Sequence, residues 1–297
     1  MALLLASIGF GLVTASILAI ASVGVTVQFG VTNYINFAYG DLLTLGAYFA
    51  WLLQNLHVPF LLAAALSIGT LGLLAVALNR LVLQPFVRRG VPLLFLLIVT
   101  FGLSLIISNI VLLVWGSDFQ SFQLPSENPL RFGPMSFTAG QLGIIVVAIL
   151  SMVAIHLLLR RTEVGRAMRA MSDDRELAQI SGINIKRITD ITWFISGCLA
   201  GLGGIVLAVN VTDFDPTFGE NFLFLIFSAV ILGGIGQPYG AMLGALVIGL
   251  ATEVSVDWVG AGYKGAVAFA ILILMLLLRP QGIIPSRGRG TTAWRMS

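Results

Sequence analysis

Charged residues are scarce in this sequence. Only 10% of its 297 residues are Asp, Glu, Lys or Arg, whereas a soluble domain carries roughly 25%. Asp41 is the only charged residue before Arg80, and the mean hydropathy of the chain is +1.01. A protein with so little polar surface cannot face water on all sides. The scarcity of charge therefore excludes a soluble globular protein and indicates a chain embedded in a membrane.

Cysteine and histidine are almost as rare. Cys198 is the single cysteine, so the chain cannot form an intrachain disulfide or a cysteine-based metal site. His57 and His156 have no carboxylate or cysteine neighbours in the sequence, which argues against a metal or catalytic centre. The phosphate-binding pattern G-x-x-x-x-G-K-[ST] is also missing. We therefore expect no metal, no cofactor and no catalytic residue in this chain.

Long apolar runs fill the sequence instead. A helix needs about 20 apolar residues to cross roughly 30 Å of hydrocarbon. The runs that qualify or nearly qualify are 3–28, 33–53, 59–81, 92–116, 140–159, 188–209, 219–236, 238–256 and 262–279. The first run is longer than a signal-peptide core of about 7–15 residues and is interpreted as a retained helix. The sequence predicts an all-α, polytopic transmembrane bundle of about 8–10 segments, some of them broken or re-entrant.

Basic residues gather in three places. All except Arg131 and Lys264 belong to the following groups: Arg80, Arg88 and Arg89; Arg160, Arg161, Arg166, Arg169, Arg175, Lys186 and Arg187; Arg279, Arg287, Arg289 and Arg295. The linkers 117–139 and 210–220 are acidic. Because cytoplasmic loops collect Lys and Arg, the loop 160–187 and the C-terminus are predicted to be cytoplasmic. The pI of about 9.4 is then a sign of topology rather than of nucleic-acid binding.

The side of the N-terminus depends on how many runs cross. If every run crosses once, the N-terminus lies outside. If the run 33–53 is broken or re-entrant, the N-terminus is expected inside.

Two stretches within the apolar runs are unsuited to an unbroken helix. Residues 31–41 include two Asn, two Tyr, a Gly and an Asp, and residues 233–240 are rich in Gly around Pro238. A broken helix survives in a membrane only where protein or a water-filled cavity covers its backbone. An ionisable residue there is a candidate for the transport pathway. The candidate pathway residues are Asn33, Asn36, Tyr39, Gly40, Asp41, Gly233, Gly234, Gly236 and Gln237.

Both stretches allow a second interpretation. The first could be an interfacial turn with Asp41 as a capping carboxylate, and the second a tight turn rather than a discontinuous helix. Tyr39-Gly40 and Tyr239-Gly240 are each followed by Leu-Gly-Ala. Paired interruptions in the two halves of a transporter point to its binding region.

The loop 160–187 is the one sizeable polar segment. Ser172 is a suitable N-cap, and Gly182 is a natural helix end. The pattern predicts a short helix at about 173–181, with Leu177 and Ile180 on one face. Such a helix could dock into a groove on a soluble partner. The alternative is a solvated loop that only enforces topology.

Several separated motifs carry a resemblance to a known family. They are Asn36-Phe37-Ala38-Tyr39-Gly40-Asp41 with Leu45-Gly46-Ala47-Tyr48, Gly165-Arg166-Ala167-Met168-Arg169-Ala170 with Gly182-Ile183-Asn184, Ile231-Leu232-Gly233-Gly234-Ile235-Gly236 with Gly240, and Arg279-Pro280-Gln281-Gly282. The sequence resembles the permeases of bacterial and archaeal branched-chain and neutral amino-acid ABC importers, in particular the first of their two paired permeases. Tyr39 departs from the family pattern, in which His is common.

The resemblance implies an assembly. This chain, as a single permease domain over 1–297, would pair with a second homologous permease, two ATP-binding subunits and an extracytoplasmic substrate-binding protein in the plasma membrane of a bacterium or archaeon. ATP would be used by the partner subunits. The candidate residues for coupling to ATP hydrolysis are Gly165, Arg166, Arg169, Asp173, Glu176, Leu177, Ile180 and Gly182.

Other functions fit the sequence less well. Importers of urea and short amides belong to the same family and remain an alternative. An ion-coupled secondary transporter needs coupling groups at the midplane, and Asp41 is the only plausible one. A membrane enzyme would need a nucleophile–base pair or a metal-ligand set, and a passive channel would not need the long capped loop.

Overall fold

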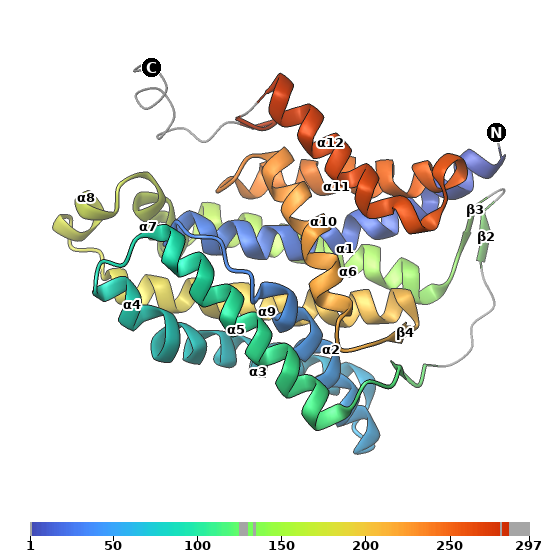
Figure 1. The fold of residues 1–297 in the computed structure, drawn as a ribbon, viewed down its shortest axis with the longest axis horizontal. Coiled ribbons are helices and arrows are strands. Elements are labelled where there is room, and N and C mark those ends of the chain that lie inside the picture. Colours follow the sequence, from blue (N-terminus) through green and yellow to red (C-terminus); the bar gives the residue numbers. More distant parts are fainter. Residues whose placement is uncertain (1, 125–129, 133–134, 280, 285–297) are drawn as a thin grey trace.

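A bundle of long helices, with two small two-stranded sheets, forms the protein (Figure 1). This computed structural model describes residues 2–124, 130–132, 135–279 and 281–284. The helices are α1 (Ala2–Thr32), α2 (Tyr39–Asn55), α3 (Phe60–Leu78), the π-helical turn η1 (Asn79–Leu83), α4 (Gln84–Arg88), α5 (Leu93–Trp115), α6 (Ala139–Arg161), α7 (Glu163–Asp173), α8 (Arg175–Ile180), α9 (Ile185–Val211), α10 (Phe218–Gly233), α11 (Pro238–Val259), the 3₁₀ turn η2 (Ala261–Tyr263) and α12 (Lys264–Leu278). The strands are β1 (Gln120–Ser121), β2 (Leu130–Phe132), β3 (Met135–Phe137) and β4 (Asp213–Phe214), with β1 antiparallel to β4 and β2 to β3. The predicted all-α polytopic bundle is confirmed.

Among the described residues, seven helices are long and apolar enough to cross a membrane. They run over Leu4–Thr32, Phe60–Arg88, Leu93–Trp115, Ala139–Arg161, Ile185–Val211, Pro238–Val259 and Ala261–Leu278. Two of the predicted runs, 33–53 and 219–236, hold shorter helices. These are α2 with 17 residues and α10 with 16. The expected break in the first of these runs is confirmed, because residues 33–38 are not helical and α2 starts at Tyr39.

The chain segments that lead into the two short helices, α2 and α10, have the same local structure. The helix before each one ends at a residue in the left-handed conformation, Asn33 with φ of 62° after α1 and Thr212 with φ of 70° after α9. Residues other than glycine rarely adopt this backbone conformation. A non-helical segment follows, and α2 then begins at Tyr39 and α10 at Phe218. Asn33 and Thr212 are separated by the same number of residues as the two helix starts, Tyr39 and Phe218.

The segments between these points also match. Asn36 and Asp215 lie at equivalent positions, and each backbone oxygen accepts a hydrogen bond from the residue three places on, over 3.4 and 3.3 Å. Each side chain accepts a hydrogen bond from the residue two places on, Asn36 from the Ala38 amide and Asp215 from the Thr217 hydroxyl. The first three residues of the two helices are Tyr-Gly-Asp and Phe-Gly-Glu. The chain therefore contains an internal repeat that relates α1–α2 to α9–α10.

The two copies of the repeat run in opposite directions. α1 ends beside α7, where a Cβ atom on Gly30 would lie 3.6 Å from the Ser172 hydroxyl, and α9 begins just after α8. α2 ends at the other end of the bundle, where the Gln54 side chain bonds the backbone of Gln123. α10 ends near α1, since a Cβ on Gly236 would lie 3.7 Å from the Phe29 ring. The repeat is inverted, as in many transporters.

The starts of α2 and α10 meet backbone to backbone. A Cβ atom on Gly40 would lie 2.9 Å from the Gly219 carbonyl oxygen, and a Cβ on Gly219 would overlap the Gly40 carbonyl oxygen. Real Cβ atoms do not approach other atoms this closely, so both positions require glycine. We call this contact the Gly40–Gly219 crossing. The counterpart of Tyr39-Gly40 is thus Phe218-Gly219, and the suggested match to Tyr239-Gly240 is wrong.

Close glycine contacts hold the other helices too. Gly197 on α9 lies against the Leu71 carbonyl of α3, and Gly249 on α11 lies against Ala15 of α1. Helices in lipid gain little from hydrophobic burial and associate through close van der Waals packing at small residues. The Gly-rich spacing of α9 and α11 therefore serves helix packing.

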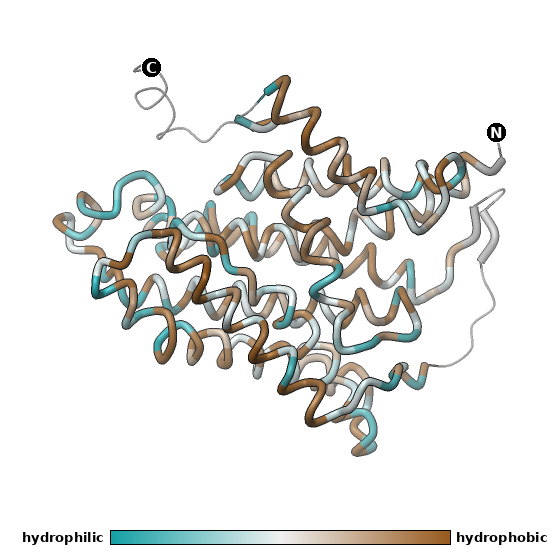
Figure 2. The backbone as a smooth tube through the Cα atoms, in the orientation of Figure 1, coloured by the Kyte–Doolittle hydropathy of each residue, from teal (hydrophilic) through white to brown (hydrophobic). Residues whose placement is uncertain are grey.

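One end of the bundle, which we call the basic end, carries α7, α8 and most of the described basic residues, among them Arg80, Arg169 and Lys186. The Arg80 guanidinium of η1 lies 2.7 Å from the Asp190 carboxylate at the start of α9. Figure 2 shows hydrophobic residues along the helix middles and hydrophilic residues on the α7–α8 connection. The N-terminus lies at the opposite end (Figure 1). The break in the 33–53 run does not bring the N-terminus to the basic end, because residues 33–38 and α2 together still cross the bundle.

The polar loop holds two helices rather than one. The predicted short helix at about 173–181 is present as α8, but Ser172 is not its N-cap, because Ser172 lies inside α7. Asp174 is the N-cap of α8 and accepts a hydrogen bond from the Leu177 amide over 2.9 Å. Gly182, with φ of 86°, follows the last turn as predicted. The sequence thus predicted an N-cap for this helix, but two residues before the observed one.

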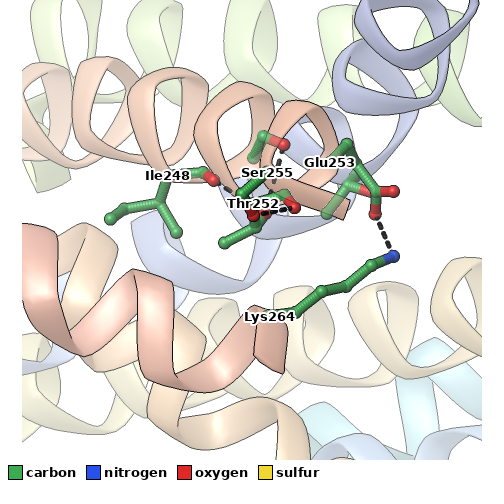
Figure 3. Close-up of polar contacts among 7 residues, drawn as sticks. Ile248, Thr252, Glu253, Ser255 and Lys264 are labelled. Carbon is green, nitrogen blue, oxygen red and sulfur yellow. Dashed lines mark hydrogen bonds and ion pairs between the residues drawn. The ribbon is translucent and has the colours of Figure 1, made fainter. Parts of the chain in front are cut away.

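A partly buried ion pair joins α11 to α12 (Figure 3). It lies at the end of the bundle opposite to the basic end (Figure 1). The Lys264 ammonium lies 2.7 Å from the Glu253 carboxylate, which also accepts a 2.9 Å hydrogen bond from Thr14 of α1. Thr252 and Ser255 bond only backbone oxygens of their own helix. Glu253 therefore links three helices at this end.

We predict that Gly40→Ala and Gly219→Ala each lower the stability of the folded protein by about 1–3 kcal/mol, the usual cost of overpacking. Thermal unfolding of the purified chain in detergent measures this. Gly102→Ala is the matched control, since a Cβ at that position in α5 meets no atom within 4 Å and alanine favours a helix. Equal melting temperatures for all three variants would contradict the close crossing.

Candidate functional site

The break between α1 and α2 is held by specific hydrogen bonds. Asn36 is 4% exposed, and its side-chain oxygen accepts from the Ala38 amide over 3.1 Å. The Ile35 carbonyl oxygen accepts from the Thr100 hydroxyl of α5. These bonds satisfy backbone groups that lipid could not satisfy. The break is thus largely buried inside the protein, and only its first residue, Asn33, is exposed.

Asp41 lies in the first turn of α2 and is only 1% exposed. Its carboxylate accepts a short hydrogen bond from the Ser104 hydroxyl of α5. Glu220, its counterpart in the first turn of α10, lies at the same contact, since a Cβ atom on Gly40 would lie 3.1 Å from the Glu220 Cα atom. The positive end of a helix favours a carboxylate at its first turn. The inverted repeat thus places two acidic side chains at the Gly40–Gly219 crossing.

Aromatic rings cover the break on the side of α5 and α10. The Phe37 ring packs edge-on against Phe101 of α5 and Phe227 of α10, with centroid distances of 6.2 and 5.4 Å. Edge-to-face pairs of this kind are favourable beyond their buried area. Phe37 therefore fixes the segment before α2 to both neighbouring helices.

The second group of candidate pathway residues lies elsewhere. Gly233 ends α10, Gly234 and Gly236 have φ of 110° and 84°, and α11 starts after Gln237. A Cβ on Gly244 would overlap the Ala229 carbonyl, so α10 and α11 form an antiparallel hairpin. The stretch is a tight turn at the basic end, as the second interpretation had it. The structure does not bring it to Asp41.

The candidate coupling residues at the start of α7 are closely packed or paired. The Thr162 side chain caps α7 by accepting from the Gly165 amide over 3.0 Å. A Cβ on Gly165 would overlap the Leu158 carbonyl, so the first turn of α7 lies directly on the end of α6. Arg166 lies 3.7 Å from Glu163, and both side chains are exposed. Surface pairs of this kind add little stability.

The candidate residues of α8 are mostly exposed. Leu177 is 61% and Ile180 84% exposed, and Glu176 also faces outward. Ala178 is the buried residue of this helix. α8 therefore rests on the bundle through Ala178 and presents two large apolar side chains outward at the basic end.

Sequence reasoning missed three residues at the crossing. Gly219 and Glu220 were assigned to an acidic linker and the next run, and Ser104 was not singled out. The signal for the first two was available, because aromatic-Gly-acidic occurs at 39–41 and again at 218–220. Nothing in the sequence marked Ser104, since its place beside Asp41 depends on how α5 packs on α2.

Metal-ligating side chains do not cluster within the described ranges. No group of three His, Cys, Asp or Glu residues comes together there. His156 has a different role, since its Nδ1 atom lies 2.9 Å from the Tyr239 hydroxyl of α11. This contact ties α6 to α11.

Comparison with known proteins agrees with this architecture. Residues 7–276 match the model of the family described as branched-chain amino acid transport system / permease component. The chain belongs to this family. Among its relatives is the high-affinity branched-chain amino acid transport system permease protein BraD of Pseudomonas aeruginosa, 32% identical over 92% of this chain and 93% of its own length.

Two further relatives extend the range of organisms. The permease LivH of Escherichia coli is 31% identical over 92% of this chain and 93% of its own length. A probable branched-chain amino acid transport permease LivH of Methanocaldococcus jannaschii is 28% identical over 92% of this chain and 90% of its own length. No solved structure matches the chain significantly. The family and the apolar helices make this protein a multi-pass membrane permease.

We predict that Asp41→Ala and Asp41→Asn both lower uptake by about tenfold, equivalent to about 1.4 kcal/mol. Asparagine keeps an acceptor for Ser104 and loses only the charge, so equal effects identify the charge as the cause. Asp118→Asn is the control, because that carboxylate is exposed beyond α5. If Asp41→Ala shows wild-type uptake at an equal amount of protein in the membrane, Asp41 has no direct role in transport.

Removing the Asn36 side-chain acceptor is predicted to lower transport by a different route. Asn36→Leu leaves the Ala38 amide without a partner, at a cost of about 1–3 kcal/mol, and loosens the break. Uptake and detergent melting temperature should fall together. A normal melting temperature with normal uptake would contradict a positioning role for Asn36.

Proposed function

We propose that this chain is the membrane-spanning permease subunit of an ATP-driven importer of branched-chain or other neutral amino acids. The whole chain, 1–297, acts as one permease domain in the plasma membrane of a bacterium or archaeon. The names of its relatives support the substrate class and the transport role. The observation that carries the proposal is the outward apolar face of α8, at the end of the bundle where the basic residues gather.

That face needs a protein partner. Leu177 and Ile180 project from a segment with few apolar residues around them, so they lie outside the hydrocarbon. An apolar helix face of this kind fits a groove on another protein. Since this chain has no phosphate-binding loop, ATP binding and hydrolysis belong to two partner subunits that grip α7 and α8.

The charge distribution supports an orientation. Arg80, Arg160 and Arg169 belong to elements that meet at the basic end, and such clusters remain in the cytoplasm. The C-terminus then lies in the cytoplasm and the N-terminus outside. A substrate-binding protein would deliver its amino acid at the outer end, and a second homologous permease would complete the pathway.

The inverted repeat supports a mechanism of alternating access. α2 runs from the Gly40–Gly219 crossing toward the outer end, and α10 runs from it toward the basic end. Tilting one half against the other about the Gly40–Gly219 crossing opens one side while closing the other. α7 rests on the end of α6 through Gly165, so movement of an ATP-binding subunit reaches the bundle through this contact.

We predict that the double variant Leu177→Ala/Ile180→Ala weakens binding of the ATP-binding subunits by about 2 kcal/mol or more, as removal of central interface side chains does. Alanine preserves the helix, so assembly in the membrane should persist while uptake falls. Copurification and proteoliposome uptake measure the two effects. Leu61→Ala, an exposed apolar side chain of α3, is the matched control.

Two results would contradict the proposal. One is full copurification and uptake in the double variant. The other is substrate accumulation driven by an ion gradient in vesicles that lack ATP and the binding protein, which would make the chain a secondary transporter.

A further inference from the structure

A cavity of about 570 Å³ lies at the basic end of the bundle. None of its lining residues belongs to the Gly40–Gly219 crossing or to the break after α1. Its apolar lining, which we call the apolar wall, includes Val27 of α1, Leu159 of α6, Met168 of α7 and Pro238 of α11. Sites for small molecules have volumes of about 300–1,000 Å³ and largely apolar walls. The cavity therefore has the size and lining of a ligand site.

Opposite charges flank the apolar wall. Arg169 and Asp173 lie one helical turn apart on α7, and both line the cavity. Within the described part of the chain, neither forms an ion pair. Their separation places both side chains on the same side of the helix. A guanidinium and a carboxylate that are both available suit a ligand that carries a carboxylate and an ammonium group.

The remaining walls are firmly placed. The Tyr239 ring is fixed by the 2.9 Å contact of its hydroxyl with His156. On the other side, α1 approaches both α7 and the α10–α11 turn at Gly30, where a Cβ would lie 3.6 Å from the Ser172 hydroxyl and 3.8 Å from the Gly236 carbonyl. Three elements that are distant in the sequence thus meet around one space.

We propose that this cavity binds a free amino acid with an apolar side chain from the cytoplasmic side, and that its occupation slows import. Arg169 holds the carboxylate, Asp173 holds the ammonium group, and the apolar side chain lies against Val27, Leu159 and Met168. The site would sense the product of transport. The inference rests on the proposed function for its orientation and for the link to import.

The position of the cavity explains how binding would slow transport. Its walls combine α7, which is proposed to receive motion from the ATP-binding subunits, with the end of α1 and with the turn that joins α10 to α11. Transport requires these elements to shift against one another. A ligand that contacts all three favours the one arrangement in which the cavity is formed. Accumulated product would thereby restrain the cycle.

Binding is tested on the full-length chain in lipid nanodiscs, without ATP and without partners. L-leucine should bind. 4-Methylpentanoate lacks the ammonium group, isoamylamine lacks the carboxylate and glycine lacks the apolar side chain, and each should bind at least about tenfold more weakly. Titration calorimetry reports all four probes. Equal binding of leucine and one of these analogues would overturn the assignment of charges.

Variants locate the site. Arg169→Gln and Asp173→Asn should each weaken leucine binding at least about tenfold, and Gly30→Phe should abolish it by filling the cavity. Gly30→Ala is the matched control, because its Cβ would make only ordinary contacts. Arg161→Gln is the charge control on the neighbouring helix, outside the cavity. Undetectable binding in the wild type, or binding unchanged by Gly30→Phe, overturns the proposal.

The effect on import is tested on the complete importer in proteoliposomes, with leucine varied only on the side of α7. Uptake should slow as leucine rises, and Gly30→Phe should remove this dependence while Gly30→Ala keeps it. An uptake rate that does not depend on leucine on this side would overturn the proposed control of import, even if leucine binds. An uptake that does not need ATP would contradict the proposed function instead, and the nanodisc measurement would still decide whether the cavity binds leucine.

Discussion

The architecture depends on one close contact, in which the first turns of α2 and α10 touch through Gly40 and Gly219. Both helices begin inside the bundle, so the segments before them would expose backbone groups to lipid if the two starts moved apart. Asn36 and Asp215 satisfy part of this backbone in equivalent ways. The rings of Phe37, Phe101 and Phe227 shield the first segment. The crossing therefore explains why two helices too short to span a membrane belong in this bundle.

The inverted repeat gives the same local structure two different surroundings. Asp41 is buried and bonded to Ser104, whereas its counterpart Glu220 is only partly buried. α2 leads away from the basic end and α10 leads to it, where α7 and α8 lie. The two copies of the repeat therefore form a symmetric core with unequal ends.

Much of the fold could be predicted from the sequence, because lipid imposes strict rules on composition. Apolar runs, basic clusters and the polar loop determined the helices and the basic end. The break before Tyr39 was predicted because Asn, Tyr and Asp cannot all lie in an unbroken lipid-facing helix. The break before Phe218 was missed because Asp213 and Asp215 also suit an external linker. Caps were misplaced, as at Ser172, because neighbouring Ser and Asp residues are equally able to cap.

The sequence by itself determined that the chain crosses a membrane many times, which end gathers basic charge, and which family it resembles. These properties depend on local composition and short motifs, and lipid enforces them segment by segment. The tertiary structure alone decided which segments meet: Gly40 with Gly219, Asp41 with Ser104, and Arg169 and Asp173 with the apolar wall around Val27. Such pairings depend on helix crossing and on close backbone approach between residues far apart in the chain, and no local pattern encodes them.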